Sequence, residues 1–72
     1  MTEQQRIERI HHFRSLKKDW DSYGADVIDP KAIDLALRIN PMLEGEWFPA
    51  PTPSGGICFQ QIKGKATILI EI

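Results

Sequence analysis

Apolar residues recur at three-residue intervals near the start of the chain, with charged residues between them. The apolar positions are Ile7, Ile10, Phe13 and Leu16. This spacing is typical of an amphipathic helix that buries one stripe of its surface. Thr2 and Gln5 fit a capping box, in which each side chain accepts a hydrogen bond from a backbone N–H at the helix start. The pattern predicts a first helix over residues 3–17.

A second helical pattern begins at Asp29-Pro30. Aspartate is a favoured N-cap, and proline suits the first helical position because an N–H there would have no intrahelical acceptor. Ile28 and Ile33 are spaced for a hydrophobic staple across this cap. Apolar residues follow along one face, and Pro41 disfavours helical backbone at the residue before it. The second helix is therefore predicted over residues 30–39.

From Gly45 onward the apolar pattern changes to a period of two, which indicates strands. Prolines alternate at positions 49, 51 and 53, so in an extended chain their missing N–H groups all point to the same side. We therefore expect residues 47–52 to form an edge strand with its proline side toward solvent. The later elements are a Ser54-Gly55-Gly56 turn, a strand over 57–62, a tight hairpin at 63–65 and a strand over 66–72.

Two helices followed by three strands, instead of alternating elements, predict an α+β domain with two N-terminal helices packed on one face of a three-stranded antiparallel β-sheet. Residues 1–72 make one such domain. In the last strand Ile68, Ile70 and Ile72 share the face that needs the helices. We expect a monomer. The alternative is a sheet that pairs with a second copy of the chain through this last strand.

Charge is distributed unevenly along the chain, although the net charge is −1. Residues 1–18 hold five basic against two acidic residues, and residues 19–46 hold seven acidic against two basic. The seven acidic residues are Asp19, Asp21, Asp26, Asp29, Asp34, Glu44 and Glu46. Such a segment is either a solvated surface or an interface for a basic surface, where carboxylates imitate the phosphates of nucleic acid. We take these seven as the candidate partner-binding residues, with Asp29 also capping the second helix.

The segment Trp20-Asp21-Ser22-Tyr23-Gly24-Ala25 is the most specific stretch of the sequence. In a structural interpretation, Trp20 and Tyr23 close one end of the core while Asp21 or Ser22 caps the local turn. In a functional interpretation, the two aromatic side chains are exposed and bind a partner, because tryptophan and tyrosine dominate binding hot spots.

Residues suited to chemistry are sparse. His11 and His12 point about 100° apart on a helix, and neither has a Cys or carboxylate four residues later to complete a metal site. Cys58 is the only cysteine and fits a small buried residue of a strand. No nucleophile with a base and no pair of carboxylates stands out, so we expect no enzyme, cofactor or metal.

The sequence also bears on location and on nucleic acid. It has no secretion signal, no pair of cysteines and no apolar run long enough to span a membrane, which favours a cytoplasmic protein without membrane contact. The basic residues of the first helix are few and are diluted by Glu3 and Glu8. We therefore expect no direct binding of nucleic acid.

Three sequence blocks carry a resemblance to a known group of proteins. They are Leu16-x-x-x-Trp20-Asp21-Ser22-Tyr23-Gly24-Ala25, Ile28-x-Pro30-x-Ala32-Ile33-x-x-Ala36 and Pro51-x-Pro53-Ser54-Gly55-Gly56-Ile57. With these blocks the chain resembles a widespread group of small bacterial and phage proteins in which no catalytic residues are recognised. Members often have an aromatic residue at the end of the second strand, where this chain has Gln61-Ile62. The resemblance covers most of the chain from Leu16 and implies no activity.

In its short length, acidic middle and lack of enzymatic parts, the chain is also similar to phage anti-CRISPR proteins, in particular to inhibitors of type I-C systems. That resemblance implies binding to subunits of the RNA-guided surveillance complex in the host bacterial cytosol and a block of target-DNA binding. Such complexes hold nucleic acid in positively charged channels, which an acidic surface could occupy. The alternative is a bacterial antitoxin or regulatory protein-interaction module that binds through the edge strand or through Trp20 and Tyr23.

Overall fold

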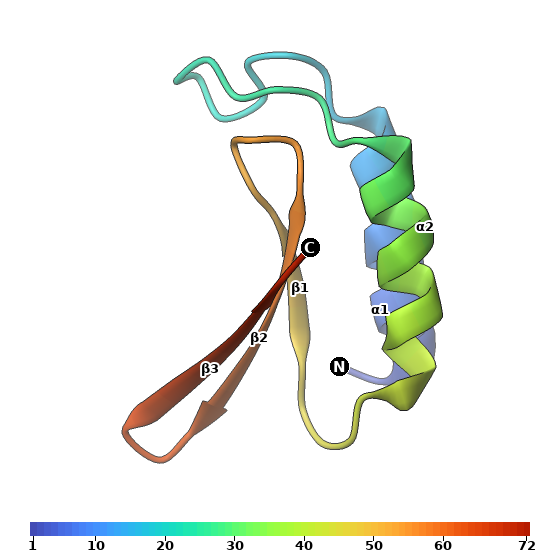
Figure 1. Ribbon diagram of the computed structural model, residues 1–72, viewed down its shortest axis with the longest axis vertical. Coiled ribbons are helices and arrows are strands. Elements are labelled where there is room, and N and C mark those ends of the chain that lie inside the picture. Colours follow the sequence, from blue (N-terminus) through green and yellow to red (C-terminus); the bar gives the residue numbers. More distant parts are fainter.

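Two helices lie against one face of a three-stranded antiparallel sheet in the computed structural model, which describes residues 1–72 (Figure 1). The elements in chain order are α1 (Glu3–His12), the 3₁₀ turn η1 (Phe13–Ser15), α2 (Pro30–Ile39), the 3₁₀ turn η2 (Asn40–Met42), β1 (Phe48–Pro51), β2 (Ile57–Lys63) and β3 (Ala66–Glu71). The predicted α+β class and its arrangement are confirmed. Neither helix has the length and apolar character needed to cross a membrane.

Both helices begin where their capping residues predicted. Thr2 Oγ1 accepts a hydrogen bond from Gln5 N at 3.1 Å, and Gln5 Oε1 accepts one from Thr2 N at 2.8 Å. This pair completes the capping box of α1. Asp29 Oδ1 accepts a hydrogen bond from Lys31 N at 2.9 Å, and α2 spans the predicted residues. Local sequence therefore determines both helix starts.

The helix α1 is shorter than predicted, and its buried face is shifted. It gives way to 3₁₀ geometry after His12, where Ser15 Oγ donates to the His12 carbonyl at 2.7 Å. Serine hydroxyls often compete in this way with the hydrogen bonds of a helix. Arg6 is buried, whereas Ile7, which the three-residue spacing placed in the buried stripe, is only half-buried. The stripe prediction is therefore wrong at its first position.

The core lies between the helix layer and the inner face of the sheet. Its buried apolar residues are Ile10, Phe13, Ile28, Ala32, Ile33, Ala36, Trp47, Ile57 and Phe59. Ala32 and Ala36 lie one turn apart on α2, and Ile57 and Phe59 share the inner face of β2. Each large side chain buried here contributes about 1.5–3 kcal/mol relative to an exposed one. These contacts hold the helices on this face of the sheet.

The strand β1 is an edge strand, as predicted, but the prediction that its proline side faces solvent is wrong at Pro49, which is fully buried. The sheet order is β1-β2-β3, and Thr52 N donates to Gly56 O at 2.9 Å in the register of the β1–β2 pair. Alternate residues of a strand direct their backbone groups to opposite sides, so those of Pro49 and Pro51 point away from β2. The missing proline N–H groups therefore interrupt no hydrogen bond of the sheet.

The β2–β3 hairpin extends away from the helix layer toward its tip (Figure 1). It turns through Gly64-Lys65, and Gly64 has the positive φ, 59°, that the first central position of such a two-residue turn requires. The strand β3 is the second edge of the sheet. Ile68 and Leu69 in this strand remain 42% and 54% exposed. The helices thus cover only part of the sheet.

Candidate functional site

Residues 19–26 form a tightly wound loop between η1 and α2, which we call the Tyr23 loop. Asp19 and Ser22 have φ of 67° and 65°, and Gly24 has φ of 83°. Positive φ is uncommon for residues with a side chain, although aspartate tolerates it better than most. Asp19 N donates to Ala25 O at 2.7 Å, and Ser22 N donates to Asp19 O at 3.0 Å. The loop therefore closes on itself through backbone hydrogen bonds.

Two aspartate side chains hold the Tyr23 loop in this shape. Asp19 Oδ1 accepts a hydrogen bond from Gly24 N at 2.6 Å. Asp21 Oδ1 accepts from Tyr23 N at 2.8 Å and from Ala25 N at 3.1 Å, which confirms the predicted turn-capping role of Asp21. Hydrogen bonds to an ionised acceptor are stronger than those between neutral groups. The two carboxylates therefore fix the backbone of the loop.

The two aromatic residues of the segment are in different environments. Trp20 is half-buried, packs against the core and donates from Nε1 to Asp26 O at 2.9 Å, as the structural interpretation predicted. Tyr23 is 93% exposed, so the structural prediction that it closes the core is wrong. Tyr23 follows a residue with positive φ, inside the turn that Asp21 closes. This turn directs the tyrosine ring to solvent, where no other element covers it.

The Tyr23 loop is also fastened to the turn between β1 and β2. Asp26 N donates to Pro53 O at 2.9 Å, and just beyond the loop Asp29 N donates to Gly55 O at 2.8 Å. Gly55 has φ of 92°, and a Cβ on it would lie 2.9 Å from Val27 O, so this close approach requires glycine. Figure 1 shows the two segments at the same end of the molecule. Backbone hydrogen bonds therefore fix the Tyr23 loop and the β1–β2 turn to each other.

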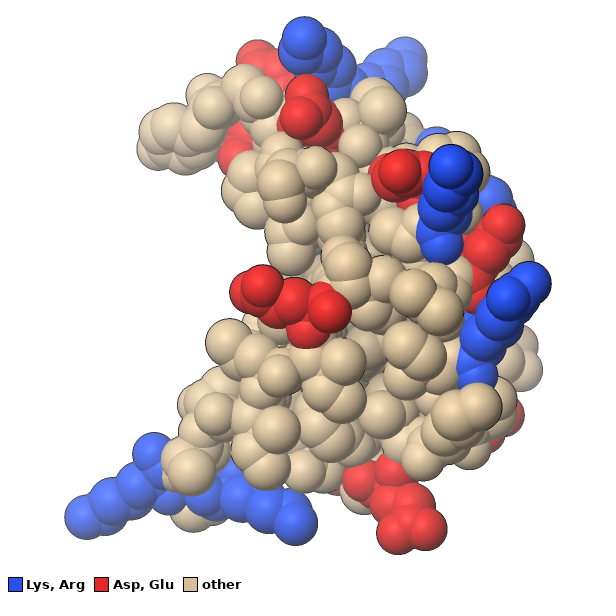
Figure 2. Space-filling view, viewed as in Figure 1, with Lys and Arg blue, Asp and Glu red and all other residues tan.

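The seven acidic candidate residues lie in three groups. Asp19, Asp21 and Asp26 belong to the Tyr23 loop, Asp29 is the N-cap of α2 and Asp34 lies within that helix, and Glu44 and Glu46 belong to the connection between η2 and β1. The first and third groups lie at opposite ends of the helix layer (Figure 1), separated by a helix about 15 Å long. Figure 2 shows acidic side chains in separate patches, with basic and uncharged residues between them. The face shown therefore carries no continuous acidic surface.

Most of these carboxylates have partners within the chain. Besides the two loop aspartates, Asp29 caps α2. Asp34 Oδ1 lies 3.4 Å from Arg14 Nη2, and Glu46 Oε2 lies 2.6 Å from the Met1 ammonium. By its hydrogen bond and its charge, the ammonium holds the pKa of the Glu46 carboxyl below its ordinary value. A partner that used these groups would compete with contacts inside the chain.

Asp26 and Glu44 differ from the other five, because their carboxylates make no ion pair or hydrogen bond within the chain. Both residues contribute to the fold through backbone atoms instead. The Glu44 carbonyl accepts hydrogen bonds from Trp47 Nε1 at 2.8 Å and from Gln61 Nε2 at 3.3 Å. The Asp26 carbonyl accepts the Trp20 bond described above. Either side chain can therefore be replaced without removing a hydrogen bond or an ion pair of the structure.

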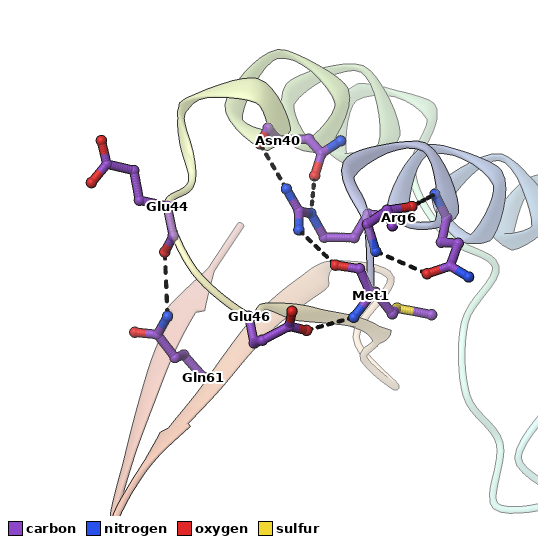
Figure 3. Close-up of polar contacts among 8 residues, drawn as sticks. Met1, Arg6, Asn40, Glu44, Glu46 and Gln61 are labelled. Carbon is purple, nitrogen blue, oxygen red and sulfur yellow. Dashed lines mark hydrogen bonds and ion pairs between the residues drawn. The ribbon is translucent and has the colours of Figure 1, made fainter.

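At the end of the helix layer opposite the Tyr23 loop lies a buried arginine that the sequence pattern did not predict. Arg6 is 4% exposed, and Asn40 is fully buried. Arg6 Nε donates to Asn40 Oδ1, and its terminal nitrogens donate to the Met1 carbonyl at 3.3 Å and to the Asn40 carbonyl at 3.5 Å (Figure 3). Asn40 Nδ2 donates to the Glu3 carbonyl at 3.3 Å. These bonds join the first turn of α1 to the end of α2.

The Arg6 guanidinium has carbonyl and amide oxygens, and no carboxylate, as its hydrogen-bond acceptors. Asn40 is the C-cap of α2, and the last carbonyl groups of a helix carry partial negative charge that favours a nearby cation. No buried side-chain nitrogen or oxygen in the structure lacks a partner, as is normal for buried polar groups in stable folds. The cluster is therefore a structural clamp between the two helices.

The remaining residues with chemical potential are dispersed. His11 and His12 are exposed, and no three His, Cys, Asp or Glu side chains are grouped so that they could hold a metal ion. Cys58 is buried in β2, as predicted, and its burial, with the nearby charge of Glu71, raises the pKa of the thiol. The largest surface hollow, of about 450 Å³, is lined by Met1, Glu46, Trp47, Phe48, Gln60 and Ile62. Its only carboxylate, Glu46, is the one paired with the Met1 ammonium.

The Tyr23 loop is thus the part of the molecule that best fits a binding site. It holds an exposed aromatic ring on a backbone braced by two carboxylates. The same loop carries a third carboxylate, that of Asp26, which has no hydrogen bond or ion pair within the chain. Comparisons with protein-family models, curated proteins and solved structures found no match to this chain. The candidate site therefore rests on the geometry of this loop.

Proposed function

We propose that this chain is a small phage-borne inhibitor that binds a type I CRISPR surveillance complex stoichiometrically, without catalysis, and blocks its binding of target DNA. The exposure of Tyr23, at 93%, is the observation that carries the binding function. Tyrosine is among the residues that contribute most to protein interfaces. Because the Asp19 and Asp21 carboxylates already order the loop, binding through it sacrifices little conformational entropy.

Charge supports the choice of partner. The Tyr23 loop carries three aspartates in addition to the exposed ring, Asp19, Asp21 and Asp26. Surveillance complexes hold nucleic acid in positively charged channels, and complementary charge speeds the association of proteins. We therefore assign the first contact to the Tyr23 loop. Glu44 and Glu46 join the contact only if the partner surface runs along the full length of α2.

The test is a titration of DNA binding by a purified type I-C surveillance complex, followed by fluorescence anisotropy of labelled target DNA. Wild type should inhibit at close to one molecule per complex. Tyr23→Ala should require at least about tenfold more protein, as expected for a hot-spot aromatic residue. Met42→Ala is the matched control, because Met42 is also exposed, at 77%, but lies on η2. Circular dichroism should show that both variants are folded.

Charge reversal tests whether the acidic residues of the Tyr23 loop or those at Glu44 and Glu46 contact the partner. Asp26→Lys and Glu44→Lys each alter a carboxylate without a partner in the chain, so both variants should keep the fold. If the Tyr23 loop makes the contact, Asp26→Lys should weaken inhibition and Glu44→Lys should not, and the difference should shrink as salt is raised. Equal inhibition by wild type, Tyr23→Ala and Asp26→Lys would remove the loop from the interface.

Failure of wild type to inhibit any of several type I complexes would overturn the proposed partner. The bacterial antitoxin or regulatory module would then be the leading function. In that case the tagged chain, purified from its host, should bring a different protein with it. The Tyr23→Ala variant, purified in the same way, should lose that protein, because the exposed ring makes the contact.

A further inference from the structure

The two edges of the sheet differ in what they offer to another strand. The outward positions of β1 are Pro49 and Pro51, which have no N–H to donate. The outward carbonyl of Pro49 is occupied, because it accepts a hydrogen bond from Arg9 Nε at 2.7 Å. Proline and a covering side chain are two of the devices by which proteins block an edge strand. The β1 edge is therefore closed.

The β3 edge has no such protection. Ile72 N donates to Ile57 O at 2.9 Å in the register of the β2–β3 pair, so the backbone groups of Thr67, Leu69 and Glu71 point away from β2. None of these residues is proline, and no hydrogen bond from elsewhere in the chain reaches their outward groups. The strand from 66 to 70 contains no charged residue that would discourage pairing.

Both faces of β3 also leave apolar side chains uncovered. Leu69 on the outer face is 54% exposed, and Ile62 on the neighbouring strand is 73% exposed. Ile68 lies on the inner face, which the helices cover elsewhere, yet it is 42% exposed because the hairpin extends away from the helix layer (Figure 1). The strand β3 therefore combines unpaired backbone N–H and C=O groups along its edge with apolar side chains that no other element covers.

We propose that β3 pairs antiparallel with β3 of a second copy of this chain, about a two-fold axis at Ile68, to form a continuous six-stranded sheet. Charge favours a second copy as the occupant. A basic residue, Lys65, precedes the strand and an acidic residue, Glu71, ends it. With Ile68 opposite Ile68, each Lys65 lies opposite Glu71 of the other copy, and opposite charges across a strand pair are favourable.

The backbone geometry permits this register. Thr67 lies opposite Leu69 of the second copy, and both residues direct their N–H and C=O groups outward. They form the hydrogen-bonded pairs of an antiparallel ladder, while the Ile68 residues form the non-hydrogen-bonded pair at the axis. The axis is perpendicular to the sheet, so the helices of both copies lie on the same face. Ile68 and Ile70 of both copies then fill the strip between the two helix layers.

The first test is the oligomeric state of the chain, measured by sedimentation velocity over about 5–500 µM, a range suited to a small interface. Wild type should form a reversible dimer. Thr67→Pro removes an outward N–H and leaves the β2–β3 ladder intact, so it should raise the dimer dissociation constant at least about tenfold. Thr67→Val keeps the N–H and should still dimerise. A wild type that stays monomeric at the highest concentration would overturn the proposal.

A charge swap tests the choice of a second copy. Lys65→Glu or Glu71→Lys alone puts like charges opposite each other at both ends of the pair, and each should weaken the dimer about tenfold at low salt. The double variant restores opposite charges and should dimerise within about twofold of wild type. Additive weakening in the double variant would rule out this pairing. Both side chains are exposed, so the folded monomer should be unaffected.

Disulfide trapping tests the register. In a Cys58→Ala background, Ile68→Cys should give a covalent dimer on mild oxidation, because residues in a non-hydrogen-bonded pair have Cα atoms about 4.5 Å apart, within disulfide range. Leu69→Cys lies opposite Thr67 and should remain largely unlinked. Equal cross-linking of the two variants would show that the axis is not at Ile68.

Discussion

The two ends of the helix layer are both held by charged side chains, but in opposite ways. In the Tyr23 loop, Asp19 and Asp21 accept hydrogen bonds from backbone N–H groups no more than five residues away. At the other end, Arg6 donates to Asn40, 34 residues away, in a buried cluster. Local, partly exposed contacts shape a loop that presents a side chain to solvent. Contacts between distant residues in the buried cluster hold the two helices together and expose no side chain for binding.

This comparison predicts that the buried clamp contributes more to stability than the loop. The largest effect is expected for Asn40→Leu, which takes away the amide oxygen that Arg6 Nε uses and leaves the buried guanidinium short of an acceptor. The free energy of unfolding should fall by about 3 kcal/mol or more, because a buried donor that loses its acceptor carries a desolvation penalty, which is larger for a charged group than for a neutral one. A domain of this size is marginally stable, so urea denaturation followed by circular dichroism should show a large loss.

The matched variants are Arg6→Met and the double variant. Arg6→Met leaves the Asn40 amide without its main partner and should lower the free energy of unfolding by about 1–3 kcal/mol. The double variant removes both polar groups and should be more stable than Asn40→Leu alone, because no charge is then stranded. Additive losses would mean that Arg6 and Asn40 act independently, and the clamp would not be one unit.

Features of the fold that depend on neighbouring residues could be predicted from the sequence, and those that depend on distant residues could not. The start of α2 was predicted correctly because Asp29 and Pro30 act on adjacent residues, and β1 because proline imposes its restrictions locally. Arg6 was missed because its acceptors are brought to it by tertiary structure. A hydrophobic pattern places Ile7 in the core, and nothing near Arg6 in the sequence signals that its charge will be buried.

A second prediction concerns the two aromatic residues at the loop end. Trp20→Ala should lower the free energy of unfolding by about 2–4 kcal/mol, because it removes a large side chain packed on the core and its hydrogen bond to the Asp26 carbonyl. Tyr23→Ala should change it by less than about 0.5 kcal/mol, as for other exposed positions. Thermal melts of both variants check this order. Similar losses in the two would contradict the division between a structural tryptophan and an exposed tyrosine.

The sequence could not divide the two aromatics in this way. Trp20 and Tyr23 belong to one motif and are both suited to cores and to interfaces. Their separation depends on the positive φ of Ser22 and on the hydrogen bonds that Asp21 makes. The sequence also could not show that the acidic residues lie far apart, because α2 separates them in the folded chain. Their closeness in sequence gave no information on how α2 would place them at two ends of the molecule.

The smallest predicted effect is a difference in the free energy of unfolding between variants of two aspartates in the Tyr23 loop. Asp21→Ala removes an acceptor that holds the backbone N–H groups of Tyr23 and Ala25, so the free energy of unfolding should fall by about 1–2 kcal/mol. Asp26→Ala removes a carboxylate without a partner in the chain and should change it by less than about 0.5 kcal/mol. Asp21→Asn keeps the acceptor oxygen and should recover most of the loss. If Asp21→Asn were as unstable as Asp21→Ala, the charge of Asp21, and not its hydrogen bonds, would be holding the loop.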